Sequence, residues 1–454
     1  MQRSARFRRV VNRSDHVGGC IYIESSFNMT IKLSAAIEAD LVLKIAEGLQ
    51  IHPIKHTYIL FSDFRWAEEL TEILPLDARE KIDRFIGERG LVRFISTEID
   101  SEMYRTDPRP IIIAGQPPSQ LPFVANAVSF ARRLIAKLKS LPIRYRLTAA
   151  LPGPFSHFLV DEIPDSISLP SQITISNGRA LPSPMPVHSE NASIDAELFH
   201  DWFASEQVDR AIQADRLYFS MPMLGYAVTS SSSVMGRQFE DHIRAFFGAA
   251  MALNVMAYGS SGETSKLPYL MVHNEETREI ITTESLEDDL LERQYYFSSE
   301  AFAKRRSKDK CAAYIAAIKK IETIFNDDLD CRRLFSACIW FYRARVNLRP
   351  LDALLQATIA IEVMLGDRKA AEGIGLTNLL ASRCAYLLGK SSAHRSEIGE
   401  KFRRVYELRS QIVHEGRHVL KAVDRATVQI ANSLCAEIIS RELSIRAMPD
   451  DSSF

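Results

Sequence analysis

The chain has 454 residues, of which 46% are hydrophobic and 25% charged, a globular composition that excludes wholesale disorder. Its longest apolar stretches, 245–259 and 353–366, are interrupted by polar residues and fall short of the about 20 residues of a spanning helix, so we expect no membrane segment. The net charge of −1 conceals 22 basic and 17 acidic residues in 1–150, 8 and 22 in 151–300, and 26 and 18 in 301–454, which makes the basic C-terminal third the better candidate to meet a polyanion.

The first part of the sequence alternates segments of strand and helix character. Short runs of β-branched and aromatic residues predict strands, and apolar residues at helical spacing predict helices. The predicted strands are 21–31, 57–61, 92–95 and 110–114, and the predicted helices are 34–49, 78–86 and 123–141. This alternation favours an α/β or an α+β domain over residues 1–175; we take it as an α/β domain and assign it a regulatory or sensor role.

Prolines mark the next boundary. Thirteen of the 19 lie between Pro108 and Pro186, and the composition of 176–197 predicts a Pro/Ser-rich linker or loop. A mixed α/β unit, strongly acidic, is expected over 198–298. Its predicted helices are 196–214 and 234–258, and its predicted strands are 269–273 and 279–283.

Helical periodicity dominates from residue 299 onward. The predicted helices are 309–325, 331–346, 351–365, 376–388, 397–414 and 419–443. They predict an all-α bundle over 299–454. The whole chain is therefore expected to be a multidomain α+β protein with an N-terminal α/β part and a C-terminal helical bundle.

The common signatures of enzymes and metal sites are missing from the sequence. None of the six cysteines forms C-x-x-C, and no Cys/His group has zinc-finger spacing. The sequence also lacks a phosphate loop, a dinucleotide fingerprint and a zinc-protease motif. We therefore expect no metal and no cofactor. Because no secretory signal is apparent, we expect a cytoplasmic protein with structural thiols.

An arginine and a histidine near the end of a predicted helix are the best candidates for chemistry. Such pairs occur three times, as Arg9/His16, Arg237/His242 and Arg409/His414. Arg409 alone lies on the apolar stripe of its helix, so we expect its guanidinium to meet a partner chain or an anion. Gly416 is expected to end that helix and to place His414 in its last turn. A proton-transferring His beside an Arg that binds phosphate oxygens suits phosphodiester chemistry.

Two further charges lie on apolar stripes. Glu362 shares a face with Leu355 and Ile359, and Arg383 shares a face with Leu380. Buried charges are tolerated when they are paired. The sequence therefore predicts a structural ion pair between Glu362 and Arg383.

Several spaced elements of the C-terminal third match one known family. They are Leu351-Asp352, 360–365 (A-I-E-V-M-L), 380–388 (L-A-S-R-C-A-Y-L-L), Tyr406 and 408–416 (L-R-S-Q-I-V-H-E-G). Through them, residues 310–445 resemble a HEPN domain of the Apea-like group. The hallmark of that superfamily is R-x4–6-H, which corresponds here to Arg409 and His414.

The resemblance implies a metal-independent endoribonuclease in which two subunits bring their R-x4–6-H elements into one cleft. His414 would transfer protons at the ribose 2′-OH or the leaving 5′-oxygen, and Arg409 would stabilise the phosphorane. Ser410 and Tyr406 would support them. The partners expected from the resemblance are RNA, a second copy bound through the C-terminal bundle, and a regulatory partner or ligand of the N-terminal half. Long proteins of this family often act in bacterial antiviral defence or as toxins.

Two alternatives stay open. Ser410 stands where catalytic members often carry a more polar residue, and Glu415 separates His414 from Gly416. A non-catalytic HEPN protein would use the bundle only for dimerisation or RNA binding. In the third hypothesis the N-terminal half is the enzyme, and a loop at Gly115 presents backbone N–H groups to an anion.

Overall fold

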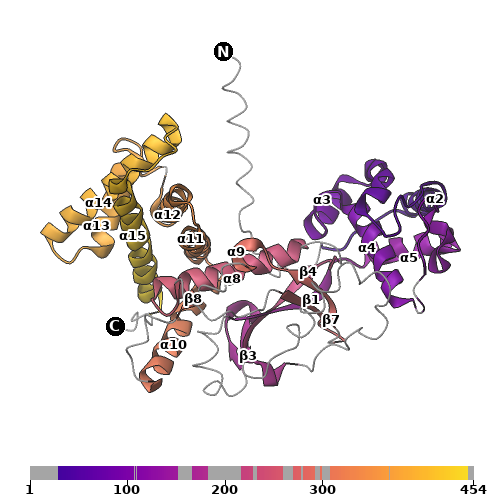
Figure 1. Ribbon diagram of the computed structural model, residues 1–454, viewed down its shortest axis with the longest axis horizontal. Coiled ribbons are helices and arrows are strands. Elements are labelled where there is room, and N and C mark those ends of the chain that lie inside the picture. The colour runs from indigo at the N-terminus through magenta and orange to yellow at the C-terminus, as the bar shows by residue number, and fades with distance from the viewer. Residues whose placement is uncertain are drawn as a thin grey trace, which may run out of the picture.

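The computed structural model describes residues 29–106, 108, 110–151, 166–181, 216–228, 233–258, 269–277, 280–291, 297–298, 307–367 and 369–447. Within these residues the fold is mixed α+β, with an N-terminal group of helices, an antiparallel sheet and a C-terminal helical bundle (Figure 1). None of the described helices is both long and apolar enough to cross a membrane.

Helices make up the regular structure that precedes the sheet in the described part of the chain. They are α2 (Ala35–Ile51), η3 (Phe61–Ile73), α3 (Leu76–Phe85), α4 (Gly90–Arg105), η4 (Pro118–Gln120), η5 (Pro122–Val124) and α5 (Ala127–Lys139). They share one core with Tyr226 and Val228, which follow a sheet strand. The predicted helices 34–49, 78–86 and 123–141 are thus confirmed as α2, α3 and α5, with boundaries that differ by a few residues.

Three strands predicted in this part are wrong. Residues 92–95 lie inside α4, where Leu91, Val92 and Ile95 are buried at helical spacing. Residues 57–60 are irregular and lead into η3. Residues 110–114 belong to no strand of the described sheets, and Ile111 and Ile113 are exposed. A short apolar run fits a helix or a strand equally well, which explains these errors.

The main sheet is antiparallel throughout, in the order β2-β3-β4-β1-β6-β7. Its strands are β1 (Ile143–Ala150), β2 (Ser166–Ser168), β3 (Thr174–Asn177), β4 (Leu217–Gly225), β6 (Tyr269–Asn274) and β7 (Ile280–Ser285). The short η6 (Pro170–Gln172) and η7 (Gly178–Ala180) flank β3, and β5 (Ala257–Tyr258) pairs with β8 (Phe297–Ser298). The expected alternation of strands and helices in an N-terminal α/β domain is therefore wrong, because helices and antiparallel strands are segregated here, as in the α+β class.

The sheet takes strands from both sides of the predicted linker 176–197, and the first two residues of that segment belong to β3. The predicted strands 269–273 and 279–283 are confirmed as the hairpin β6–β7. The predicted helix 196–214 and most of the predicted strand 21–31 lie outside the described residues.

Helix α8 (Val234–Ala252) lies between the sheet and the bundle (Figure 1). The Phe219 ring of β4 contacts the rings of Phe239 and Phe246 on α8, at centroid distances of 5.7 Å. A single hydrophobic core continues from this sheet face through α8 into the bundle. The bundle comprises α10 (Ser307–Ile321), η11 (Glu322–Phe325), α11 (Leu329–Val346), α12 (Pro350–Leu365), α13 (Leu376–Leu388), α14 (Ser392–Glu415) and α15 (Ala422–Arg446). All six predicted helices of this region are confirmed.

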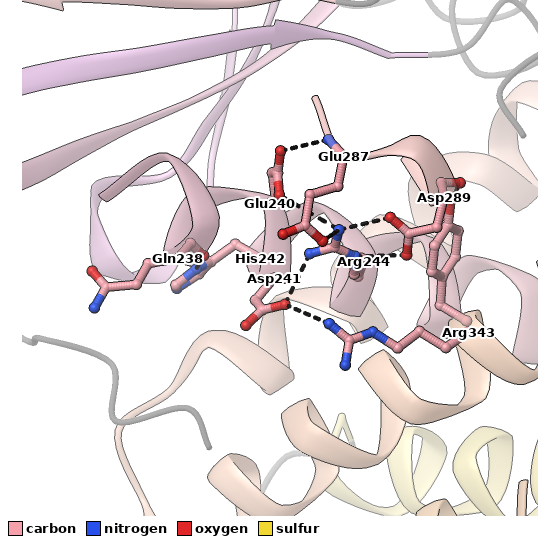
Figure 2. A network of polar contacts seen from close by, with 9 residues as sticks. Gln238, Glu240, Asp241, His242, Arg244, Glu287, Asp289 and Arg343 are labelled. Carbon is pink, nitrogen blue, oxygen red and sulfur yellow. Dashed lines mark hydrogen bonds and ion pairs between the residues drawn. The ribbon is translucent and has the colours of Figure 1, made fainter. Parts of the chain in front are cut away.

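A buried charge network fastens α8 to the segment that connects the sheet with the bundle (Figure 2). Its centre is Arg244, whose side chain is 1% exposed. The Arg244 guanidinium lies 2.7 and 2.9 Å from Asp289, 2.8 Å from Glu287, 3.0 Å from Asp241 and 3.5 Å from Glu240. Arg343 of α11 joins through Asp241 at 3.5 Å. One network therefore links α8, the segment around α9 (Asp288–Leu291) and the bundle.

Candidate functional site at the end of helix α14

Helix α14 begins at Ser392, five residues before the predicted start at 397, and ends where its sequence predicts. The Ser391 hydroxyl caps its first turn by accepting the N–H of His394 at 3.2 Å. Gly416 adopts a left-handed conformation with φ 69°, which a residue without a side chain reaches at low cost. The N–H of Arg417 then donates to the Gln411 carbonyl at 3.3 Å. His414 lies in the last turn, as predicted.

Arg409 is on the inner face of α14 and contacts an acidic residue of a neighbouring helix. Its Nη2 lies 3.4 Å from Oε1 of Glu362 on α12, and the two side chains are 21% and 24% exposed. The guanidinium carbon lies 5.3 Å from the ring centroid of Tyr406, one turn earlier. The expected partner of Arg409 is thus supplied, within one chain, by a carboxylate.

The Arg409–Glu362 contact leaves donor capacity unused. Arg409 Nε is buried and makes no hydrogen bond, whereas Glu362 Oε1 faces Arg409 Nη2 at 3.4 Å. Burial first, and then the nearby charge of Glu362, raise the pKa of Tyr406. Its ring stacks on Phe402 at 5.8 Å, which fixes it against the core. The arrangement is a half-buried cation with donor capacity to spare, which suits contact with an anion.

The predicted ion pair between Glu362 and Arg383 is wrong. Arg383 of α13 donates to the Leu365 carbonyl at the end of α12, at 2.6 Å. It also lies 3.6 Å from the Asp367 carboxylate. A cation is favoured at a helix C-terminus, where carbonyl groups lack helical partners, and Arg383 takes that position. Glu362 lies one turn earlier and is left to Arg409.

His414 and Arg409 point in different directions from α14. Five residues at 100° each separate them by about 140° around the axis and about 7.5 Å along it. His414 is exposed, whereas Arg409 faces α12, and Ser410 between them is half-buried. One chain therefore does not direct both side chains toward a single phosphate.

The other predicted candidates occupy structural positions. His242 is fully buried, with its ring 4.9 Å from Phe335 and its Nδ1 2.8 Å from the Gln238 carbonyl. The Gly115 N–H donates to the Ile54 carbonyl at 2.7 Å, so this amide is not available to an anion. The Arg9/His16 pair lies outside the described residues. The described cysteines are buried free thiols, and burial raises the pKa of Cys384 to about 12.

Sequence reasoning missed the Arg244 network. Its signal is present in the acidic run at 287–289 and in Arg244, which lies on the buried face of α8 among phenylalanines. In the part of the chain that the structure describes, no group of three or more His, Cys, Asp or Glu side chains is placed to hold a metal ion.

Comparisons with protein-family models, with curated proteins and with solved structures find no match for this chain. The assignment of function therefore depends on the residues themselves and on the resemblance that they carry.

Proposed function

We propose that the protein is a metal-independent endoribonuclease of HEPN type that works as a homodimer. The observation that carries the proposal is the placement of Arg409: a half-buried guanidinium, held by Glu362 and Tyr406, at the same helix end as an exposed His414. A cation oriented in advance stabilises charge that develops on a phosphorane. An exposed imidazole can move protons.

The proposed reaction transfers the phosphoryl group within the RNA. The ribose 2′-oxygen attacks phosphorus while one His414 accepts the 2′-OH proton. The P–O5′ bond breaks, and the second copy's His414 donates a proton to the leaving oxygen. The products are a 2′,3′-cyclic phosphate and a free 5′-OH, so the reaction cuts RNA and not DNA. Two copies are needed because α14 itself ends with one histidine, which points away from Arg409, and His418 lies beyond Gly416 in the connection to α15.

The test is incubation of the purified protein with total cellular RNA in EDTA, followed by sequencing of new 5′ ends. We expect cleavage by the wild type, and none by folded His414→Ala or Arg409→Ala proteins. His394→Ala, on the first turn of the same helix, is the matched control and should retain cleavage. Full activity of folded His414→Ala would overturn the proposal.

A second candidate, a non-catalytic HEPN protein that only dimerises or binds RNA, is favoured by one observation. Arg409 already has a carboxylate partner, so its position is also explained by packing alone. Wild-type protein that binds RNA but leaves it intact in the same assay would select this candidate.

The proposed role of residues 1–298 is regulation of a cytoplasmic effector in bacterial antiviral defence or in a toxin system. It is supported by the continuous core that connects the sheet with the bundle through α8. We expect that expression is toxic in bacteria and that toxicity requires His414. Toxicity that persists in the His414→Ala protein would contradict this role.

A further inference from the structure

Positive charge gathers at the end of the bundle that carries His414. Arg404 of α14, Lys421 and Arg425 are all exposed. Within the described residues none of the three forms an ion pair. We call these three residues the basic turn: Lys421 and Arg425 lie at the start of α15, and Arg404 lies beside that start on α14, about 15 Å along the helix from His414. They are not the residues assigned to the chemistry.

The contacts around this connection hold the basic turn together. Arg404 Nη2 lies 3.5 Å from the Val423 carbonyl, which places it beside the first turn of α15. Arg417 donates to Gln411 Oε1 at 2.6 Å and pairs with Asp424. Asp424 also accepts the Lys421 N–H at 2.7 Å. The one buried carboxylate of this turn is therefore already occupied, and it leaves the three exposed cations unneutralised.

The opposite end of α15 carries charges of both signs. There Arg446 lies 3.8 Å from Asp328, 3.3 Å from Asp330 and 3.6 Å from Glu442. Lys320 lies 3.2 Å from Ser444 at the same end, and Arg332 of α11 pairs with Asp327. Charges that are paired in this way attract a polyanion less than the exposed cations of the basic turn do.

We propose that the basic turn binds the backbone phosphates of a single-stranded RNA and so delivers the linkage beside His414. This inference rests on the proposed function for the identity of the polyanion. Phosphate contacts fix register without reading sequence. A single strand is required because in-line attack by the 2′-OH needs a backbone free to leave helical geometry.

The test separates binding from cleavage. The probe is a fluorescent 2′-O-methyl oligouridine of about 15 nucleotides, which lacks the attacking hydroxyl, titrated in EDTA at 50 to 200 mM KCl. Neutralising three phosphates of a single strand contributes about 2 to the slope of log affinity against log salt. The variant Arg404→Gln/Lys421→Gln/Arg425→Gln should lose about that slope and bind at least about tenfold more weakly.

The matched control is Lys32→Gln/Arg65→Gln/Arg132→Gln, which removes three exposed cations outside the bundle. It should bind the probe like the wild type. Circular dichroism establishes folding, and single Lys421→Gln and Arg425→Gln proteins should each show a partial loss of slope.

The outcomes distinguish this inference from the proposed function. If the salt slope of the triple variant is unchanged, or the wild type does not bind the probe, the basic turn does not bind RNA. If the wild type binds the probe through the basic turn but does not cleave the matching RNA that carries 2′-OH groups, the basic turn binds RNA and the protein is not a nuclease. If the wild type cleaves RNA while the salt slope of the variant is unchanged, the protein is a nuclease and the basic turn does not bind its RNA.

Discussion

At the residue scale, Glu362 pairs with Arg409 of the candidate site and not with Arg383 of α13. In a fully buried ion pair, removing one partner lowers the free energy of unfolding by about 3–5 kcal/mol. Glu362 and Arg409 are 24% and 21% exposed, however, and solvent screens such a pair. Its contribution to stability is therefore small, and its main consequence is the direction of the guanidinium.

The corresponding prediction concerns Glu362→Gln. We expect its free energy of unfolding to change by less than about 1 kcal/mol. Its single-turnover cleavage rate at saturating RNA should fall about 10- to 100-fold, because a guanidinium displaced by about 1 Å loses its alignment. Urea unfolding and quenched-flow cleavage measure the two effects. Glu397→Gln, which removes the exposed partner of Lys401 on α14, should leave cleavage unchanged. Unaltered cleavage by Glu362→Gln would show that the Glu362–Arg409 contact has no role in cleavage.

Two buried carboxylates should make stability depend on pH. Burial raises the pKa of Glu284 to about 7, although Ser233 donates to it through its N–H and its hydroxyl at 2.8 and 3.0 Å. Burial likewise raises the pKa of Glu240 to about 7 against the opposing charge of Arg244. A raised pKa means that the folded state holds a proton that the unfolded chain releases. Stability from these groups is full below about pH 4.5 and is lost as pH rises toward 7.

Glu284→Gln should therefore flatten the pH dependence. Wild-type unfolding free energy should fall by up to about 3 kcal/mol between pH 5 and pH 8 for each such group. In the variant, the part of this fall that comes from Glu284 should disappear, because the glutamine amide still accepts the hydrogen bonds of Ser233 but has no charge. Chemical denaturation at pH 5, 6, 7 and 8 measures the slope. Parallel wild-type and variant curves would show that Glu284 is ionised throughout.

At the scale of elements, amphipathic helices were predicted correctly, whereas the strands β1 and β4 were missed. The bundle helices carry long apolar stripes with a 3.6-residue period, and a strand cannot satisfy that pattern over 13 or more residues. β4 lies in the middle of the sheet, and its first five residues are buried on both faces, so no alternation remains there. β1 does alternate, with buried Tyr145 and Leu147 following Arg144 and Arg146, and that signal was overlooked in the sequence.

Pro222 in β4 argues further against a strand. The structure tolerates Pro222 because only residues 217–220 of β4 pair with β3. Beyond Ser220, β4 has β1 as its one neighbour.

The helix η3 shows a signal that the usual templates overlook. Its apolar residues recur every three positions, at Phe61, Phe64, Ala67, Leu70 and Ile73. A 3₁₀ helix has three residues per turn, so this spacing places the apolar residues on one face, although the backbone is kinked at Phe64. Phe64, Ala67 and Leu70 are buried accordingly. A search at period 3.0 would have found an element that searches at 3.6 and 2.0 miss.

Substituting alanine for two helical glycines should change stability in opposite directions. A Cβ added at Gly248 would lie 2.0 Å from the Cys338 carbonyl oxygen of α11, whereas one at Gly399 in α14 would lie 3.6 Å from the flexible end of Arg403. Gly248→Ala should lower the unfolding free energy by about 1–3 kcal/mol, because α8 and α11 must separate. Gly399→Ala should raise it by about 0.5–1 kcal/mol, because alanine favours the helix. Equal shifts in thermal unfolding would show that α8 and α11 are not in close contact.

At the scale of the whole molecule, the Arg244 network determines which parts move together. Five hydrogen bonds from the buried Arg244 guanidinium join α8 to the segment that follows the sheet, and the ion pair of Arg343 with Asp241 adds α11 (Figure 2). Removing one partner from such a site leaves an uncompensated buried charge. The sheet, α8 and the bundle are therefore expected to unfold as one unit, which is a physical requirement for regulation of one by the other.

The last prediction is that the active site is shared between two subunits. Scission by the 2′-OH needs a base, an acid and charge stabilisation of the phosphorane. Each α14 ends with one exposed histidine, His414, about 140° around the helix from Arg409, while His418 lies beyond Gly416 outside the helix. An isologous interface supplies the missing groups, because it presents each patch twice.

Wild-type protein mixed with folded His414→Ala protein, under conditions that exchange subunits, tests this arrangement directly. At a ninefold excess of the variant, about nine wild-type subunits in ten are paired with a defective partner. Activity per wild-type subunit should then fall to about one tenth if one cleft needs both histidines. Mixing with His394→Ala protein, which keeps His414, should cause no such loss. Constant activity per wild-type subunit across the series, from a protein that sediments as a monomer while it cleaves, would mean that a single chain completes the site.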